Sequence, residues 1–308
     1  MASLKYLISH MHENLCKLKD PSTPIEDGSA KMYKDRAVKF GEWCKAEYRC
    51  KTPEECLPYL QDYADWLVDC GKSPNTIHTY LAGICRWFKI PLDSISKPKR
   101  VVADNTRSRG VKAVDSRSDA QREASPELYD FALVVGIRRA EYKHLRGDDL
   151  VVDESGYLCV RVKQGKGGKY QEQRIAPEDV DFVRSFFDGS KNKVFSEKEM
   201  KNKLDLHHLR ALRAQRAYND YVTRLETDPE YRAQLIEEVR RRWVRLCSKK
   251  WDPKRAEGNY CIRGNSRRLA LANGLPVRYD RLAVMAVSVF HLSHWRCDVT
   301  VGNYLLAV

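Results

Sequence analysis

The 308-residue sequence lacks the ligand patterns of a metalloprotein and the long apolar runs of a membrane protein. Its ten cysteines form no C-x-x-C pair and no cysteine–histidine cluster at zinc spacing. No apolar run approaches the roughly 20 residues of a membrane helix, and the N-terminus lacks the apolar centre of a secretory signal. These absences predict a cytoplasmic protein with no metal, no cofactor and no membrane contact. We expect Cys44, Cys70, Cys85 and Cys159 to be buried small residues in a reducing compartment.

Positive charge is concentrated in two segments of the chain. Lysine and arginine number 55 against 42 aspartates and glutamates, a net charge of +13. Residues 97–122 hold 8 basic and 3 acidic residues, and residues 206–282 hold 18 and 9. Such local excess is typical of a protein that binds a polyanion, most simply nucleic acid, and we expect association with the nucleoid. An anionic membrane surface is the alternative partner. The candidate phosphate contacts in the first segment are Lys97, Lys99, Arg100 and Arg107.

The spacing of apolar residues predicts a mainly α fold with a small β-hairpin or sheet, an α+β protein. Helical periodicity runs through residues 29–88, and alternation on both sides of a glycine-rich turn at 164–169 predicts the hairpin. The polar stretch at 92–122 is poorly periodic and reads as a linker that either follows phosphates or is only a hinge. The expected organisation is an N-terminal helix in 1–28, a helical domain in 29–91, a basic linker in 92–122 and a second domain in 123–308.

Residues 228–247 form a strongly amphipathic segment of the second domain. Its apolar stripe is too regular for a solvated arm, so we predict a packed helix. The arginines beside the stripe face either DNA or a neighbouring subunit, and the sequence leaves both open. The stripe consists of Tyr231, Leu235, Val239, Trp243 and Leu246.

Two arginines lie three positions from a side chain that is able to assist them. Arg138 precedes Glu141, whose carboxylate could fix the orientation of the guanidinium. His207 precedes Arg210, so both share one face if this stretch is helical, and Arg213 continues that face as a further candidate DNA contact. Taken singly, these patterns are satisfied by an exposed ion pair and by a solvated basic helix.

Two further motifs contribute a lysine, a histidine and a tyrosine. The turn QGKGGK at 164–169 does not have Walker spacing. It places Lys166 where it could deliver a proton, and Lys169 where it could contact a phosphate. His294 lies ten residues before Tyr304. Together with two arginines, such groups suit phosphodiester transfer: arginines clamp the non-bridging oxygens, lysine and histidine move protons, and tyrosine forms a covalent intermediate.

The order of these motifs resembles that of the phage-integrase family of tyrosine recombinases. The stretch His207-His208-Leu209-Arg210 matches the family's H-x-L-R box, with His208 in the variable position. The other similar segments are 29–88 for the core-binding domain, 136–141 with Leu145 for the first arginine box, 164–177 for the hairpin lysine motif, and 292–294 with Tyr304 for the last box.

The resemblance implies a site-specific recombinase or integrase that integrates or excises a mobile element. It would cleave and rejoin double-stranded DNA through a 3′-phosphotyrosyl intermediate, without ATP or metal. The two domains would form a C-shaped clamp, acting as a homo-oligomer: a dimer on one site and a tetramer in the synapse, with room for accessory DNA-bending proteins. The implied roles are Tyr304 as nucleophile, Arg138 and Arg210 as phosphate ligands, Glu141 as the brace of Arg138, Lys166 as general acid, His207 as the group that assists deprotonation of the tyrosine, and His294 as a phosphate ligand.

The sequence also departs from the family's pattern. His207 and His294 lie 87 positions apart, which predicts an insertion at about 219–280. Only four residues follow Tyr304, so we do not expect the helix that many members exchange between subunits. Two other functions stay open. One is a topoisomerase-like activity that relaxes DNA with the same residues, and the other is a catalytically inactive recombinase-type DNA-binding regulator.

Overall fold

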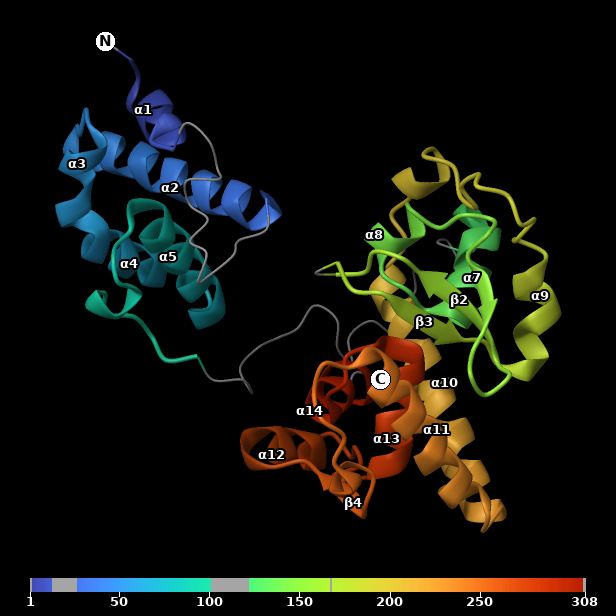
Figure 1. Ribbon diagram of the computed structural model, residues 1–308. Coiled ribbons are helices and arrows are strands. Elements are labelled where there is room, and N and C mark those ends of the chain that lie inside the picture. Colours follow the sequence, from blue (N-terminus) through green and yellow to red (C-terminus); the bar gives the residue numbers. More distant parts are fainter. Residues whose placement is uncertain (1, 13–26, 101–121, 167, 307–308) are drawn as a thin grey trace. The chain divides into compact units, whose positions relative to one another are not determined.

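The chain divides into two compact units, Met1–Asn105 and Thr106–Val308, and each is described by itself (Figure 1). The computed structural model describes residues 2–12, 27–100, 122–166 and 168–306. The chain is mostly helical with small antiparallel sheets, as the sequence predicts. Within the described ranges, no helix combines the length and the apolar character needed to cross a bilayer.

The first unit is a helical bundle built around α2 and α5. Ser73 begins α5 by accepting a hydrogen bond from the backbone of Thr76, and Pro74 occupies the first helical position, where its missing N–H costs nothing. The bundle also includes α1: a Cβ on Gly41 would lie 2.1 Å from Ile8 Cδ1, so the glycine lets α1 pack closely on α2. The elements are α1 (Leu4–His10), α2 (Asp27–Tyr48), α3 (Pro53–Cys56), η2 (Leu57–Tyr59), α4 (Leu60–Asp69), α5 (Pro74–Phe88) and η3 (Leu92–Ser94).

The core of this unit follows the predicted apolar stripes with two exceptions. Phe40, Leu81 and Ile84 are fully enclosed. The apolar spacing of Leu60, Tyr63, Trp66 and Leu67 predicts that all four face inward, but Trp66 is 39% exposed, because the inward face of α4 is already filled by its neighbours. Cys70, expected to be buried, is exposed because it lies just beyond the end of α4. The cysteines at 44, 85 and 159 are buried as predicted.

The second unit contains the predicted hairpin, extended by one strand. Strands β2 and β3 pair antiparallel, with Val162 opposite Gln171 at the turn. The additional strand, β1, pairs with the outer side of β2 and was not predicted. Its elements before the long central helix are α7 (Pro126–Val135), α8 (Arg139–Tyr142), β1 (Leu150–Val152), β2 (Leu158–Val162), β3 (Gln171–Arg174), η5 (Pro177–Asp179), α9 (Val180–Arg184) and η6 (Glu199–Lys201).

A single helix, α10, runs through the middle of this unit. Asp205 caps its start by accepting hydrogen bonds from the backbones of His207 and His208. Buried Ala214 and Ala217 on α10 leave room for Tyr304 to pack closely. The elements from α10 onward are α10 (Leu206–Thr227), α11 (Tyr231–Leu246), η7 (Pro253–Arg255), β4 (Asn259–Cys261), α12 (Gly264–Ala272), β5 (Arg278–Asp280), α13 (Arg281–Val287), η8 (Ser288–Leu292), α14 (Cys297–Thr300) and η9 (Val301–Leu305).

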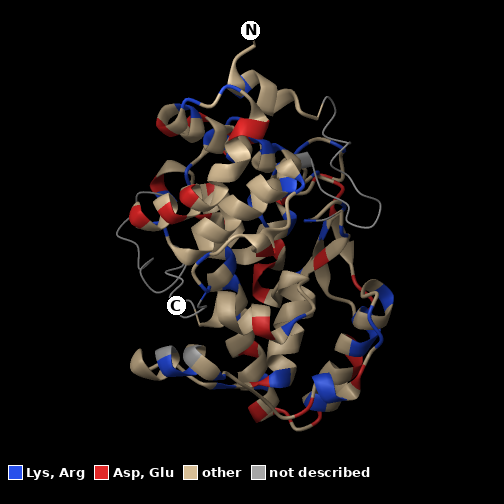
Figure 2. Cartoon of the chain, turned by 90° about the vertical axis from the view of Figure 1, so that its left-hand side faces the viewer, with Lys and Arg blue, Asp and Glu red and all other residues tan. Residues whose placement is uncertain are grey.

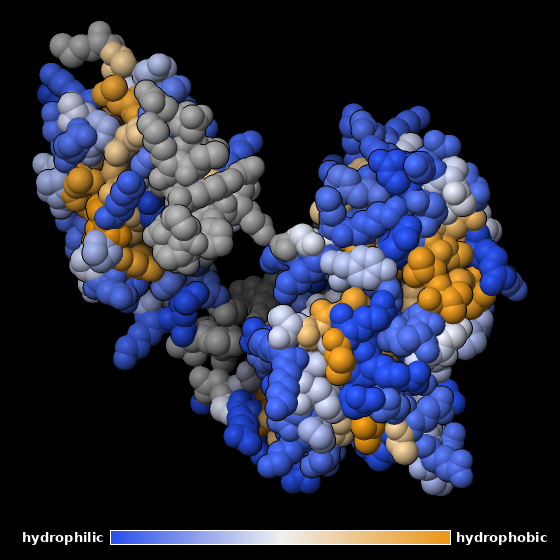
Figure 3. Space-filling view, in the orientation of Figure 1, coloured by the Kyte–Doolittle hydropathy of each residue, from blue (hydrophilic) through white to orange (hydrophobic). Residues whose placement is uncertain are grey.

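Helix α11 packs against the unit as predicted, with its apolar stripe inward. Leu235, Val239 and Trp243 are fully enclosed against α13 and η8. The face of the second unit shown in Figure 3 is mostly hydrophilic, broken by small hydrophobic areas. The segment predicted as an insertion is therefore folded into the core of the unit over its α11 part.

Two buried arginines share one carboxylate oxygen beneath α11. Asp153 Oδ2 accepts hydrogen bonds from Arg174 Nε and from Arg242 Nη2, each at 2.6 Å. Arg174 Nη1 also donates to Glu238 Oε2 at 2.6 Å. Burial acts to raise the pKa of Asp153, but Arg174 and two backbone amides outweigh it, and the net pKa is lowered. These contacts join β3 and the β1–β2 turn to α11.

A second set of ion pairs extends this network toward the surface. Arg245 Nη1 donates to Glu172 Oε1 at 3.0 Å, and its Nη2 lies 2.7 Å from Glu154 Oε2. Arg242 Nε donates to the other oxygen of Glu154 at 3.0 Å. The sequence had left DNA or another subunit as partners for these arginines. Arg242 and Arg245 instead bind carboxylates of their own unit.

Replacing Arg242 by alanine should destabilise the protein by about 3–5 kcal/mol, because Asp153 and Glu172 would keep buried charge with one partner fewer. Urea denaturation measures the loss. The matched control is Arg240→Ala on the same helix, whose exposed pair with Glu237 should contribute little. Equal effects of the two substitutions would contradict the account of α11 docking.

Candidate active site

Arg210 links the backbones of two distant segments. It is fully buried, and its Nη1 donates to Gly136 O at 2.6 Å while its Nη2 donates to Leu292 O at 2.7 Å. The first carbonyl precedes Arg138 by two residues, and the second precedes His294 by two. Its Nε–H has no partner among the described residues, and such a buried donor is suited to bind a ligand oxygen. Burial is the main cause that lowers the pKa of the Arg210 guanidinium.

The turn that carries one of these carbonyls requires glycine. Gly136 ends α7 in the left-handed conformation, at φ +62°, where a side chain would be strained. A Cβ there would also lie 3.1 Å from Cβ and Cγ of Arg213. The close approach of the turn to α10 brings its carbonyl within reach of Arg210.

Two histidines flank the phenol ring of Tyr304. His294 Nε2 lies 2.9 Å from Tyr304 Oη, within hydrogen-bond distance. The His207 ring centroid is 5.4 Å from the tyrosine ring centroid, and Arg210 Cζ lies 5.8 Å from it. Tyr304 itself is 3% exposed and lies on the π-helix η9. The structure thus brings the two histidine motifs and the tyrosine to one point.

The turn that presents His294 contains unusual backbone geometry. Ser293 and Trp295, on either side of it, both have positive φ, +51° and +59°. Such conformations cost free energy in residues other than glycine and persist only where the surroundings impose them. Ser288 holds the turn: its carbonyl accepts from His294 N, and its hydroxyl accepts from Arg296 N. His294 is therefore fixed by its own backbone.

The surroundings keep His294 neutral. Burial, followed by nearby positive charges, lowers its pKa from 6.5 to about 3. A neutral imidazole facing a phenol is able to accept its proton. The positive groups that lower the pKa of His294 are Arg210, Arg138, His207 and Lys166, so each of these four lies within electrostatic reach of His294, whose Nε2 also contacts Tyr304 Oη.

A chain of hydrogen bonds joins the first arginine to the turn of His294. Arg138 Nη1 donates to Glu141 Oε1 at 2.7 Å, and Glu141 is 3% exposed. Gln171 Nε2 donates to the same oxygen at 3.3 Å. Gln173 Nε2 lies within bonding distance of Gln171 Oε1, 3.3 Å, and of Ser293 Oγ, 3.1 Å. Sequence reasoning missed both glutamines, and the available signal was their placement on one face of the strand after the lysine turn.

The lysine turn packs directly on this chain. A Cβ on Gly165 would lie 1.7 Å from Gln171 Nε2, so the glycine lets the amide cross beneath the turn. Lys166 is exposed and makes no hydrogen bond or ion pair with the residues that the structure describes. Lys169 is also exposed. Both ammonium groups are thus accessible to a phosphate.

Arg213 requires a correction. It was expected to contact DNA, but its side chain is 2% exposed and its Nη2 lies 3.4 Å from Arg174 O. The face of α10 that Arg213 shares with Arg210 packs into the unit. A solvated basic stripe and a stripe that faces the core have the same spacing in sequence. On α10 the stripe faces the core.

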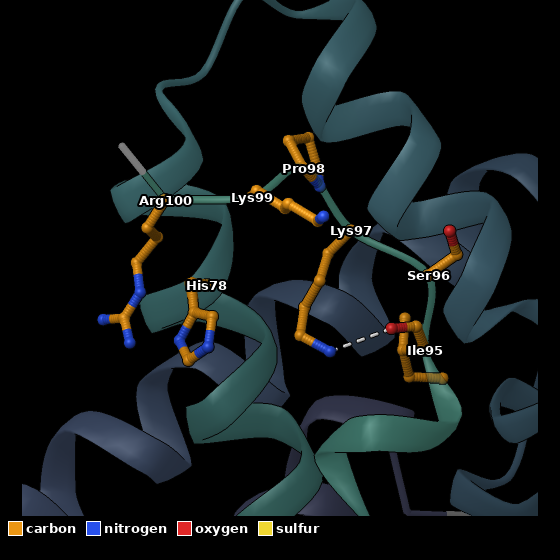
Figure 4. A pocket seen from close by; sticks show the side chains of 7 residues that line it. All are labelled: His78, Ile95, Ser96, Lys97, Pro98, Lys99 and Arg100. Atoms are coloured by element: carbon orange, nitrogen blue, oxygen red, sulfur yellow. Dashed lines mark hydrogen bonds between the residues drawn. The ribbon is translucent and has the colours of Figure 1, made fainter. Parts of the chain in front are cut away.

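The described part of the basic linker lines an open hollow of about 590 Å³ in the first unit (Figure 4). Lys97 Nζ is held by the carbonyls of Leu92 and Ile95, at 2.8 and 2.9 Å, so its charge is already partly engaged. Lys99 and Arg100 are exposed. Arg107 lies outside the described residues. The lining residues are His78, Ile95, Ser96, Lys97, Pro98, Lys99 and Arg100.

Comparison with known proteins adds little to this geometry. No protein-family model matches the chain, and no curated protein matches it either. One similar solved structure is described as the crystal structure of XerA recombinase. It is 14% identical, the match covers 98% of this chain and 92% of that chain, and the TM-score is 0.26. A TM-score this low does not establish a shared fold.

The His294 imidazole should show no protonation between pH 5 and pH 8 in the free protein, because its pKa is about 3. Since the unfolded chain binds this proton near pH 6.5, His294 should also reduce stability progressively as the pH falls below that value. Nuclear magnetic resonance of the ring nitrogens measures the titration, with His294→Gln identifying the signal. A midpoint near 6.5 would contradict the proposed surroundings.

Substitution of Arg210 by alanine should destabilise the protein by about 2–5 kcal/mol, since two buried carbonyls lose their donor. Thermal or urea unfolding measures this effect. Arg184→Ala, which removes an exposed arginine of the same unit, is the control and should leave stability nearly unchanged. An Arg210→Ala protein as stable as that control would show that Arg210 does not organise the site.

Proposed function

We propose that the chain cleaves and rejoins duplex DNA through a covalent bond to Tyr304, as a tyrosine recombinase does. The observation that carries this proposal is the 2.9 Å contact between His294 Nε2 and Tyr304 Oη beside the buried Arg210. A tyrosine with a neutral base on its oxygen and guanidinium groups nearby is equipped to attack a phosphodiester. Integration or excision of a mobile element is the role carried over from the resemblance.

In this mechanism the phenol oxygen of Tyr304 attacks the phosphorus, and the bond to the 5′ oxygen breaks. The phenol proton passes to His294 Nε2, and Lys166 supplies a proton to the departing 5′ oxygen. Arg138 and Arg210 balance the charge on the non-bridging oxygens. A 5′-hydroxyl of a partner strand reverses the step, so no bond free energy is lost and no ATP is needed.

The proton acceptor differs from the one that the resemblance implies. The resemblance assigns deprotonation to His207 and phosphate contact to His294. The free protein has His294 on the phenol oxygen and His207 beside the ring. We therefore assign the first proton transfer to His294, with His207 positioned to contact the phosphate beside Arg210.

Bound DNA would make His294 a stronger base. The low pKa of His294 comes first from burial and then from the surrounding positive groups. A phosphate anion bound between the arginines would offset those charges and raise the pKa toward its ordinary value. His294 then accepts a proton readily only when DNA occupies the site.

DNA contacts outside the catalytic centre also belong to this proposal. Lys99, Arg100 and Lys169 are exposed and suited to phosphates, and the two units would close on the duplex as a C-shaped clamp. Action as a dimer on one site and a tetramer in the synapse is part of the same proposal.

A library of nicked duplexes with randomised flanks tests the function without knowledge of the target sequence. A nick beside the cleaved phosphate lets the short strand diffuse away and traps the covalent adduct, which denaturing gels resolve. The native protein should form adducts, and Tyr304→Phe should form none, because it lacks only the attacking oxygen. Tyr260→Phe in the same unit is the matched control and should retain adduct formation.

Each other outcome identifies a different function. Duplex binding without any adduct in the native protein would favour the inactive regulator. Adducts without sequence enrichment, together with relaxation of supercoiled plasmid, would favour the topoisomerase-like enzyme. Adducts that persist in Tyr304→Phe would reassign the nucleophile.

A further inference from the structure

The positive charge of residues 206–282 is distributed between two structurally different parts. On α10 and α11, the arginines are largely buried or paired with carboxylates. Arg232 lies 2.7 Å from Asp280, and Arg240 lies 2.7 Å from Glu237. The charge of these helices is therefore compensated within the unit.

Residues 249–278, which we call the basic module, carry their charge differently. They contain eight basic and two acidic residues. One of the two acids, Asp252, caps the short helix η7 by accepting from Lys254 N. Four arginines are exposed and make no ion pair or hydrogen bond with any residue that the structure describes. They are Arg263, Arg267, Arg268 and Arg278.

The basic module packs on the element that carries the nucleophile. Strands β4 and β5 form a hairpin-like pair, with α12 between them in sequence, and both strands contact α13. Ile262 and Ala270 of the module, with the adjoining Tyr279, belong to one buried cluster with Val301 and Leu305 of η9. In β5 the side chains alternate, so that Tyr279 faces inward and Arg278 outward. The buried side of the module thus packs on η9, which also carries Tyr304, and its exposed arginines lie on the other side; Figure 2 marks the lysines and arginines of the chain in blue.

The composition of the outer face identifies the kind of partner. Unpaired arginines close together repel one another, and a polyanion removes this cost. Guanidinium groups bind phosphate oxygens through two parallel hydrogen bonds. Helix α12 has nine residues, and among those whose side chains are described Leu271 is the one large exposed apolar side chain, which does not make the broad apolar face of a membrane-surface helix.

We propose that the basic module binds the phosphate backbone of duplex DNA beyond the cleaved phosphate. The choice of partner rests on the proposed function. The module's position on η9 lets the same contacts hold the DNA next to Tyr304. A recombinase-type unit would thereby gain a second phosphate-binding surface within its catalytic unit.

Salt dependence of binding to an intact duplex of random sequence tests this surface. Fluorescence anisotropy compares the full chain with a fourfold variant, Arg263→Gln, Arg267→Gln, Arg268→Gln and Arg278→Gln. The slope of log K against log salt should fall by about 0.9 for each arginine that contacts a phosphate. These side chains have no partners in the described structure, so the circular dichroism spectrum should not change and the melting temperature should not fall.

A second fourfold variant removes the same net charge from arginines that are already paired. It carries Arg184→Gln, Arg232→Gln, Arg240→Gln and Arg241→Gln, and should keep most of the native slope. Equal slopes for both variants would overturn the proposal, because the effect would then be one of net charge alone.

Binding to intact duplex is independent of chemistry at Tyr304. If no covalent adduct forms but the two variants still differ, the proposed function fails and the binding surface stands. If adducts form and the variants do not differ, the function stands and the surface fails.

Discussion

The second unit depends on one buried guanidinium. Arg210 donates to a carbonyl from the turn after α7 and to a carbonyl from η8, which lie 156 positions apart in the chain as Gly136 and Leu292. An unpaired buried arginine would be very costly, so both backbones are held at fixed distance from α10. Because one carbonyl precedes Arg138 and the other precedes His294, this constraint also fixes the spacing of the functional groups. Structure and proposed chemistry are thus joined in one residue.

Strand β3 adds contacts on both of its faces to the constraint that Arg210 imposes. Gln171 and Gln173 point toward the site and link Glu141 to the turn of His294. Glu172 and Arg174 point the other way and bind the arginines and Glu238 of α11. All four side chains of β3 are buried although all are polar. A polar strand is stable in this position only because every face of it meets a hydrogen-bonding or charged partner.

The sequence alone was sufficient to predict the structure where a repeating pattern of apolar residues, or the order of a few chemically distinctive residues, decides it. Apolar periodicity predicted the helices of the first unit, the hairpin and the packing of α11. The order of arginine, lysine, histidine and tyrosine predicted which segments would meet. The hydrogen-bond and ion-pair partners of individual side chains were harder to predict, because a buried polar strand such as β3 and a surface strand have the same composition. Likewise, the burial of Arg213 and the pairing of Arg242 depend on which face of a helix the rest of the unit covers, and a single sequence does not encode this locally.

The proposed reaction requires that Tyr304 becomes covalently attached to DNA. Mass spectrometry of the trapped complex tests it most directly, after nuclease removal of the DNA and digestion with trypsin. The tryptic peptide that begins at Cys297 contains Tyr304 as its only tyrosine. We expect a nucleotide on this peptide, joined through the phenol oxygen. A nucleotide found on any other residue would contradict it.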